Sequence, residues 1–266
     1  MTVPRSKIGW CDYSGGDLNF ALRGSARGDC EVSPGCAHCY AGAILRRNGQ
    51  TSPVTTWSTK KLNRLAKWQP DPGAEPYRRG PGSRPLAFPC DMGDLFHEAV
   101  PEEFIFQALD LMYLRSDVDW QILTKRAERM SELTSRWYLT HRRPFAEHLW
   151  LGVSVEDMAR ADERIPWLLA TPARVRFLSC EPLLGPLWFE RCTAWDLDQF
   201  CLDGIDWVIV GAESGPDRRP FDMLWAAEIR DQCRATATAY FYKQGSHRFP
   251  GRDDVLDGHT YKEFPR

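Results

Sequence analysis

One stretch decides how the whole chain is interpreted: Cys30-Glu31-Val32-Ser33-Pro34-Gly35-Cys36-Ala37-His38-Cys39-Tyr40. It holds three cysteines, with five residues between the first two and two between the last two, and it leads into a helix-like run from Ala41 to Arg47. Two thiolates at the shorter spacing can reach one metal centre, and the Pro-Gly turn can fold the first cysteine back to join them. The stretch therefore predicts a metal site formed by Cys30, Cys36 and Cys39.

Two kinds of metal group suit such a loop. Three thiolates without an obvious fourth ligand match a [4Fe–4S] cluster with one open iron, because thiolates are the usual protein ligands of these clusters. A closed structural zinc site normally takes four ligands. His38 is poorly placed beside Cys39 to bind the same ion, and His97 would have to fold back from far along the chain. The residues favour iron–sulfur and leave zinc open.

The remaining cysteines show no metal-binding spacing. Isolated cysteines usually behave as small buried hydrophobes, and we expect this of Cys11, Cys90, Cys180, Cys192, Cys201 and Cys233. The three-cysteine loop differs because it lies in a polar turn, where a buried hydrophobe has little to pack against. The total of nine cysteines is odd, which argues against a disulfide framework and favours a reducing compartment.

Composition indicates a globular protein with no general attraction to nucleic acid. The chain has 266 residues, 43% of them hydrophobic and 26% charged, enough for one large α/β domain or barrel. Its net charge is −2, so any nucleic-acid binding needs a local basic patch. Residues 1–10 contain no apolar run like that of a signal peptide, and no stretch approaches the ~20 apolar residues that cross a bilayer. We expect one cytoplasmic domain over residues 1–266.

Strand-like and helix-like segments alternate through most of the chain. Expected strands cover 18–22 (weakly), 85–90, 119–124, 149–155, 175–180, 207–212 and 239–242. Expected helices cover 59–67, 101–114, 126–137, 156–170 (interrupted by Pro166) and 222–235. Residues 69–84, rich in Pro, Gly and Arg, form an exposed loop. This alternation predicts a parallel sheet in an α/β fold, most economically a partial, open β/α barrel of about six strands.

Polar residues follow each expected strand directly. They are Asp91 and Asp94, Lys125 and Arg126, Ser154 and Glu156, Ser179 and Glu181, Glu213 and Ser214, and Lys243 and Gln244. Any one of them can be an ordinary loop residue or helix cap. The carboxyl ends of barrel strands, however, face the active site, and residues two apart share one face of a strand. Taken together, these positions predict carboxylates and hydroxyls around one end of the barrel, where the carboxyl ends of the strands meet; we call this end the mouth.

The segments with these residues resemble a known family. They are Ser33 to Tyr40, Asp94-Leu95-Phe96-His97, Leu123 to Arg126, Gly152 to Asp157, Phe177 to Leu183, Gly211 to Gly215 and Tyr242-Lys243-Gln244. In order and spacing the chain is similar, from about Lys7 to Gly245, to a phage- and prophage-associated family with a three-cysteine motif. That family is related to radical S-adenosylmethionine (SAM) enzymes.

The resemblance implies a partial β/α barrel with the cysteine loop after its first strand. In radical SAM enzymes three cysteines hold a [4Fe–4S] cluster, and SAM chelates the fourth iron through its amino and carboxylate groups. Reduction of the cluster by a protein such as flavodoxin or ferredoxin then yields a 5′-deoxyadenosyl radical. Carried over by position, Cys30, Cys36 and Cys39 are the ligands. The commonest form of that superfamily has three residues, not five, between its first two cysteines.

The resemblance also implies contacts with the cofactor. The common form has an aromatic residue before the third cysteine; here His38 or Tyr40 can lie against the adenine. The segment after the second strand usually meets the amino group of SAM, which makes Asp91, Met92, Gly93 and Asp94 candidates. Ser154, Glu156 and Glu181 are candidates for ribose or carboxylate contacts, and Ser179 and Glu213 are further cofactor-binding candidates. Lys125 and Arg126 could pair with the carboxylate or with a substrate phosphate. Cys90 could return a hydrogen atom to a product radical, although a buried structural role is the commoner one.

The substrate suggested by the resemblance is a nucleic-acid base or nucleotide, in phage DNA or tRNA. Basic residues that could contact phosphates are Arg78, Arg79 and Arg84 in the loop, Lys60, Lys61, Arg64 and Lys67 on a helix, and Arg218 and Arg219. Solvated surface charge explains each group as well. Two other hypotheses stay open. One is a zinc-stabilised nucleic-acid-binding protein without catalytic activity, and the other is a barrel that has lost its catalytic activity and acts as a phage accessory protein. Oligomeric state and reaction outcome do not follow from these residues.

Overall fold

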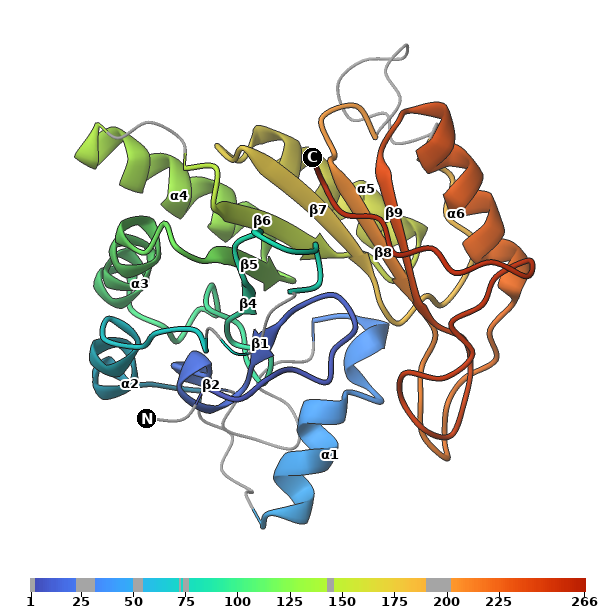
Figure 1. Cartoon of the computed structure of the whole chain (residues 1–266), viewed down its shortest axis with the longest axis horizontal. Coiled ribbons are helices and arrows are strands. Elements are labelled where there is room, and N and C mark those ends of the chain that lie inside the picture. Colours follow the sequence, from blue (N-terminus) through green and yellow to red (C-terminus); the bar gives the residue numbers. More distant parts are fainter. Residues whose placement is uncertain are drawn as a thin grey trace.

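The sheet of this protein is parallel throughout and follows the order of the chain. The computed structural model describes residues 3–22, 32–49, 55–71, 73, 77–142, 146–189 and 202–266. Seven strands form the sheet in sequence order: β1 (Tyr13–Ser14), β4 (Leu86–Phe88), β5 (Asp119–Thr124), β6 (Leu149–Ser154), β7 (Val175–Cys180), β8 (Trp207–Gly211) and β9 (Ala239–Gln244). The sheet curls without closing (Figure 1). The predicted partial β/α barrel is confirmed, with seven strands where about six were expected.

Helices connect the strands and cover the outer face of the sheet (Figure 1). They are α2 (Thr59–Leu65), α3 (Glu102–Leu114), α4 (Ala127–His141), α5 (Met158–Ala170) and α6 (Met223–Ala235). Side-chain caps fix the starts of α2, α5 and α6, where Ser58, Asp157 and Asp222 accept backbone N–H groups of the first turn. The expected interruption at Pro166 is wrong, because α5 continues through it and only one helical N–H is lost. Among the described residues no helix is long and apolar enough to cross a membrane.

The inner face of the sheet carries an aromatic cluster toward the amino ends of the strands. Its rings belong to Trp10, Phe88, Trp150, Phe177, Trp207 and Phe241. Along β8 the side chains alternate, with Trp207 and Ile209 in this cluster and Val208 and Val210 in the core under the helices. Gly152 lies on the same face, where a Cβ would approach the Phe177 ring to 2.6 Å. The amino end of the half-barrel is therefore filled with side chains.

The N-terminal segment departs from the expectation. The predicted first strand at 18–22 is wrong: the strand that joins the sheet is β1, and Ala21–Leu22 (β2) pairs antiparallel with Thr56–Trp57 (β3) in a separate two-stranded sheet. Gly15 and Gly16 cause the difference, because their φ angles of 79° and 56° turn the chain between the two strands. The apolar Leu18 and Phe20 are buried as predicted, but they lie in the connection.

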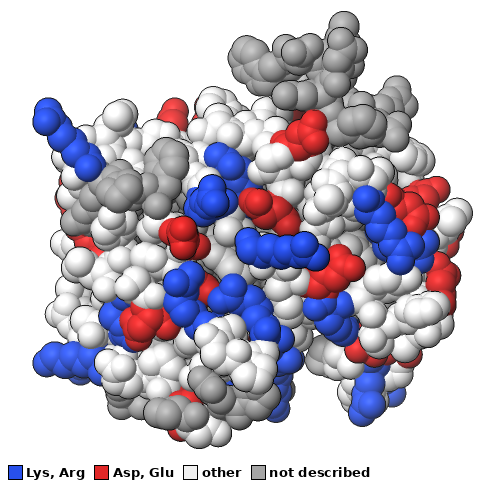
Figure 2. All heavy atoms as spheres, turned by 45° about the horizontal axis from the view of Figure 1, so that its top comes forward, with Lys and Arg blue, Asp and Glu red and all other residues white. Residues whose placement is uncertain are grey.

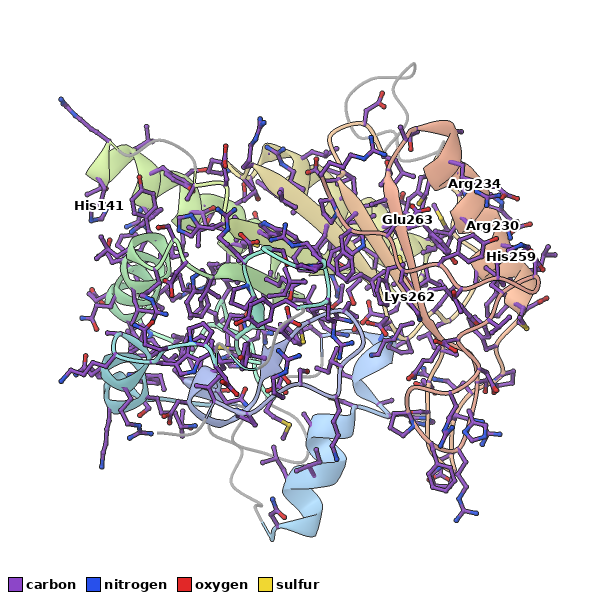
Figure 3. The ribbon with its side chains drawn as sticks, in the orientation of Figure 1. His141, Arg230, Arg234, His259, Lys262 and Glu263 are labelled. Carbon is purple, nitrogen blue, oxygen red and sulfur yellow. The ribbon has the colours of Figure 1, made fainter. Side chains whose placement is uncertain are left out.

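The C-terminal segment closes the free edge of β9. Tyr242 donates its N–H to the carbonyl of Tyr261 (2.9 Å), and Glu263 donates its N–H to the carbonyl of Tyr240 (3.2 Å). Figure 3 shows Lys262 and Glu263 beside β9, with Arg230 and Arg234 of α6 near His259 at the outer rim. These bonds occupy backbone groups that an open edge would leave unpaired. The residues after 248, which the sequence assigned no role, therefore complete the sheet.

Two arginines of the loop at 69–84 are tied to a buried carboxylate, while Arg78 is exposed and the Arg84 side chain is 41% exposed. Arg79 and Arg84 both pair with Asp119, which is fully buried at the start of β5. Arg78 donates to the carbonyl of Cys11 at 2.7 Å. A buried carboxylate needs such partners, so Arg79 and Arg84 are engaged in an ion pair within the fold and do not form a free phosphate-binding patch. On the face that Figure 2 turns toward the viewer, acidic and basic residues are interspersed, with no broad basic area.

Candidate metal and cofactor site

The cysteine loop is a tight turn between two of the three predicted ligands. Pro34–Cys36 form a 3₁₀ turn, and the N–H groups of Cys36 and Cys39 donate to the carbonyls of Ser33 (2.9 Å) and Cys36 (3.2 Å). Helix α1 (Tyr40–Arg47) begins directly after it. Such a turn suits two ligands of one centre. Cys30 and the side chain of Tyr40 lie outside the described residues, so their predicted roles stay predictions.

The buried Glu156 ties this loop to the end of β6. Ser33 donates its hydroxyl to Glu156 Oε1 at 2.5 Å, and Lys125, after β5, donates its ammonium group to the same oxygen. Arg164 of α5 donates from Nη1 to Glu156 Oε2 at 3.1 Å. Gly35 packs directly on the carboxylate, since a Cβ there would lie 2.6 Å from Oε1. Glu156 thus fixes the loop beside the carboxyl end of β6.

The surroundings of Cys36 favour its thiolate form. Burial opposes the charged form, but the Lys125 ammonium, the backbone N–H groups of Val32 and Ser33 and the Ser33 hydroxyl together lower the pKa of this thiol below its usual value. The Ser33 oxygen lies 3.7 Å from Cys36 Sγ. Because the thiolate is the form that binds metals, Cys36 is prepared as a ligand. Within the described residues, which include two of the three loop cysteines, no group of three His, Cys, Asp or Glu could hold a metal ion.

Glu213, after β8, forms a second attachment for the loop. It pairs with Arg219, whose Nη1 also donates to the carbonyl of Pro34 at 3.1 Å. The Nδ1 atom of His38 lies 3.3 Å from Glu213 Oε2. Arg219 and its hydrogen bonds lower the pKa of Glu213 against the opposing effect of burial. The loop is therefore attached to the ends of β5, β6 and β8.

Glu181 and two serines continue the mouth along β6 and β7. Glu181 accepts from the indole of Trp10 (3.0 Å) and from Lys243 near the end of β9 (2.7 Å). Ser154 and Ser179 are neighbours in the β6–β7 register, both buried, and each lies one inward position before Glu156 or Glu181. The shared face predicted for these residues from the period of two is thus occupied by interacting side chains. Gly211 leaves room for Glu181, since a Cβ there would lie 2.6 Å from its Oε1.

The segment after β4 contains two aspartates in different settings. Asp94 is buried and accepts from the Thr124 hydroxyl (2.7 Å), from the N–H of Lys125 (3.2 Å) and from Arg126 Nη1 (3.1 Å), so it links the ends of β4 and β5. Asp91 lies nearer the β1 end of the mouth, where burial raises its pKa despite hydrogen bonding from Asn19 and Ser14. Met92 donates its N–H to Asn19 at 3.1 Å, and Gly93 donates its own to the carbonyl of Cys90 at 2.8 Å.

Cys90, two residues after β4, has an unusual backbone conformation. Its φ is 60°, a left-handed value that non-glycine residues seldom adopt, and its side chain is buried. Burial raises the pKa of its thiol far above the ordinary value, so the S–H form persists at neutral pH. Unlike Cys36, it is prepared to remain protonated.

Sequence reasoning did not predict the contacts of several residues of the site. Arg164 could have been found as a charged residue on the buried stripe of α5, beside Ala161, Ile165 and Leu168. Lys243 was predicted as a polar strand end and Arg219 as a possible phosphate contact, but their ion pairs with Glu181 and Glu213 were not predicted. Ser33 and Trp10 carry no local signal, because their partners are 123 and 171 residues away.

Comparison with known proteins places the chain in a family. Residues 5–265 match the family model described as "Protein of unknown function (DUF5131)". The chain belongs to the DUF5131 family. No curated protein and no solved structure matches it. The description of the DUF5131 family names no activity, so the function has to be argued from the mouth of the half-barrel.

Proposed function

We propose that this DUF5131 protein is a radical SAM enzyme whose [4Fe–4S] cluster is bound by Cys30, Cys36 and Cys39. The observation that supports this most is the attachment of the cysteine loop to the carboxyl ends of three strands, with a Cys36 environment that favours thiolate. Thiolates at the mouth of a parallel β/α sheet lie where such folds bind their ligands. The donor set suits iron–sulfur ligation better than a closed zinc site, which needs a fourth ligand.

The residues around the mouth would bind and orient the cofactor. When bound and reduced, a cluster of this type supplies the electron that cleaves SAM to a 5′-deoxyadenosyl radical. Asp91, Met92, Gly93 and Asp94 follow the second barrel strand and are proposed to meet the amino group. Lys125 offers an ammonium group for the carboxylate. Ser154, Ser179, Glu156, Glu181 and Glu213 are proposed to contact the remaining polar groups of SAM. His38 and Tyr40 are proposed to lie against its adenine.

The other end of the interior has a supporting role in this proposal. The aromatic cluster around Trp207 fills the half-barrel below Ser154 and Ser179 and keeps water from entering from that side. Cys90, with its protonated and buried thiol, is a candidate donor of a hydrogen atom to a product radical.

We further propose a nucleic-acid base or nucleotide as the substrate, a flavodoxin or ferredoxin as the reductant, and the cytoplasm as the location. Arg78, Arg79 and Arg84 are engaged at the opposite end of the interior and contribute nothing to this proposal. The exposed Arg218, which donates to Ser246 at 3.1 Å beside the Glu213–Arg219 pair, is the better-placed phosphate contact.

SAM cleavage tests the proposed activity. Anaerobically reconstituted protein would be reduced chemically in the presence of SAM, and 5′-deoxyadenosine would be quantified. We expect release from the wild type and from Cys233→Ala, which removes a buried cysteine of α6, but none from Cys36→Ala. A wild type that holds its cluster, binds SAM and releases no 5′-deoxyadenosine would contradict the proposal.

A further inference from the structure

The three glutamates of the mouth do not all pair with the same number of basic side chains. Glu181 pairs with Lys243, and Glu213 pairs with Arg219, one cation to each carboxylate. Glu156 pairs with two cations, Lys125 and Arg164. Of these three groups of described mouth residues, the Glu156 group therefore has a surplus of one positive charge, and like the Glu213 group it touches the cysteine loop.

The two cations of this group differ in position. Arg164 is 1% exposed, reaches Glu156 from the helix side and also donates to the carbonyl of Ser154 at 2.7 Å. It is part of the packed interior and suffices to neutralise the carboxylate. Lys125 is 20% exposed and, besides Glu156, donates to Ser33 Oγ at 2.8 Å. The surplus charge is thus carried by Lys125, on the side of the loop.

Lys125 is also the cation that acts on a predicted cluster ligand. Its ammonium group shares Ser33 with Cys36, whose sulfur lies 3.7 Å from the Ser33 oxygen. A [4Fe–4S] cluster with three thiolate ligands has a net negative charge that grows on reduction. The reduction potential of such clusters depends on nearby charge and on hydrogen bonding to sulfur. A fixed cation in a partly buried site interacts strongly with added negative charge, since the effective dielectric constant there is well below that of water.

We propose that Lys125 is a positioning residue that tunes the redox potential: its ammonium group, held by Glu156 and Ser33, raises the reduction potential of the cluster on the cysteine loop. This inference rests on the proposed function. In the reduction step the cluster accepts one electron from the reductant protein, Lys125 stays protonated, and no bond or proton is exchanged. Lys125 therefore does more than fasten the loop, because Ser33 and Gly35 already hold the loop to Glu156.

The test is a potentiometric titration of the reconstituted cluster, followed by electron paramagnetic resonance. Lys125→Met removes the surplus charge and is expected to make the midpoint potential more negative, with Lys125→Gln as the substitute if the Met variant does not fold. Lys125→Arg keeps the charge and should stay close to wild type. Lys243→Met, which removes a mouth lysine paired with Glu181, is the matched control and should shift the potential less. Glu156→Gln removes a negative charge and should shift it in the opposite direction.

Opposite signs for Lys125→Met and Glu156→Gln are the decisive result, since loosening of the loop would not produce them. Neutral Lys125 variants that hold the wild-type amount of iron at the wild-type potential would overturn this inference and leave the proposed function standing. A wild-type protein that binds no cluster would overturn both.

Discussion

The two ends of the half-barrel interior are built from the same strands, yet they differ in almost every chemical respect. At the amino ends, inward positions hold Trp150, Phe177 and Trp207, and the C-terminal Phe264 stacks on Trp207 with 5.3 Å between ring centroids. Further along β6 and β7 come Ser154 and Ser179, and after these strands come Glu156 and Glu181 with their cations. The amino end excludes water, and the mouth contains the charged side chains.

This contrast separates stability from function along each strand. Conserving volume is what matters in the aromatic cluster, because packed interiors tolerate few voids. At the mouth, each buried carboxylate requires specific partners, and those partners determine where the cysteine loop lies. Substitutions in the aromatic cluster should therefore reduce folding stability, whereas substitutions at the mouth should reduce binding of the metal group.

Trp207→Ala is expected to have the largest effect on stability. Trp207 is fully buried, and its ring lies within 6.2 Å, centroid to centroid, of the rings of Trp10, Trp150, Phe177, Phe241 and Phe264. Removing it leaves a large cavity, so we expect a loss of about 3–5 kcal/mol in the free energy of unfolding, measured by chemical denaturation. Trp188→Ala, at a 44% exposed tryptophan, is the control and should cost less than about 1 kcal/mol. Equal losses would refute the assignment of stability to the aromatic end.

Glu156→Gln is expected to affect both stability and the cysteine loop. It leaves Lys125 and Arg164 without their shared carboxylate, and breaking a buried pair in this way costs about 3 kcal/mol. Metal content after reconstitution should also fall, because Ser33 loses its acceptor. Glu98→Gln breaks an ion pair whose acidic partner is 65% exposed, and it should change stability by about 1 kcal/mol or less. A Glu156 variant as stable as that control would contradict the central role of this carboxylate.

Gly35→Ala examines the contact between the loop and the mouth. The added Cβ would lie 2.6 Å from Glu156 Oε1 and 2.9 Å from its Cγ, so either the loop or the carboxylate has to move. We expect a loss of about 1–3 kcal/mol and reduced iron content, measured on the same preparation. Gly185→Ala provides the matched control, because its Cβ would meet no atom within 4 Å. If both variants bind iron like the wild type, the packing of Gly35 on Glu156 does not position the loop.

The acid dependence of stability gives the smallest expected effect. Burial opposes ionisation of Glu156, but Lys125, Arg164 and the Ser33 hydroxyl hold the pKa of its carboxyl below the ordinary value of 4.5. The folded state therefore binds this proton less readily than the unfolded state, and the resulting stabilisation is complete above about pH 4.5. It is lost as the pH falls through the lowered pKa. The stability difference between wild type and Glu156→Gln should shrink over that acid range. A constant difference would argue against a stabilising role for the ionised Glu156 carboxylate.

The regular half of the fold could be predicted because its signals are local. The strands at 119–124 and 175–180 were located to the residue, and the strand predicted at 149–155 ends at Ser154 in the structure. Strand ends also indicated the mouth, because parallel strands bring their carboxyl ends to one edge. Nothing local, however, indicated that Glu156 would reach the cysteine loop rather than free solvent.

The irregular parts resisted prediction for physical reasons. The apolar run at 18–22 resembles a strand, but the positive φ angles of Gly15 and Gly16 redirect it. Arg79 and Arg84 resemble an exposed basic patch in a Pro- and Gly-rich loop, yet Asp119 draws them inward from 40 and 35 residues away. In both cases a contact between distant segments determines the outcome, and single-sequence patterns do not encode it.

The most direct test of the account is the iron, acid-labile sulfide and zinc content of anaerobically purified protein, compared between wild type and Cys36→Ala. We predict about four irons and four sulfides per chain in the wild type, lost in the variant, as a [4Fe–4S] cluster on the cysteine loop requires. About one zinc and no iron, in protein produced with ample iron, would contradict the radical mechanism and favour a zinc-stabilised binding protein.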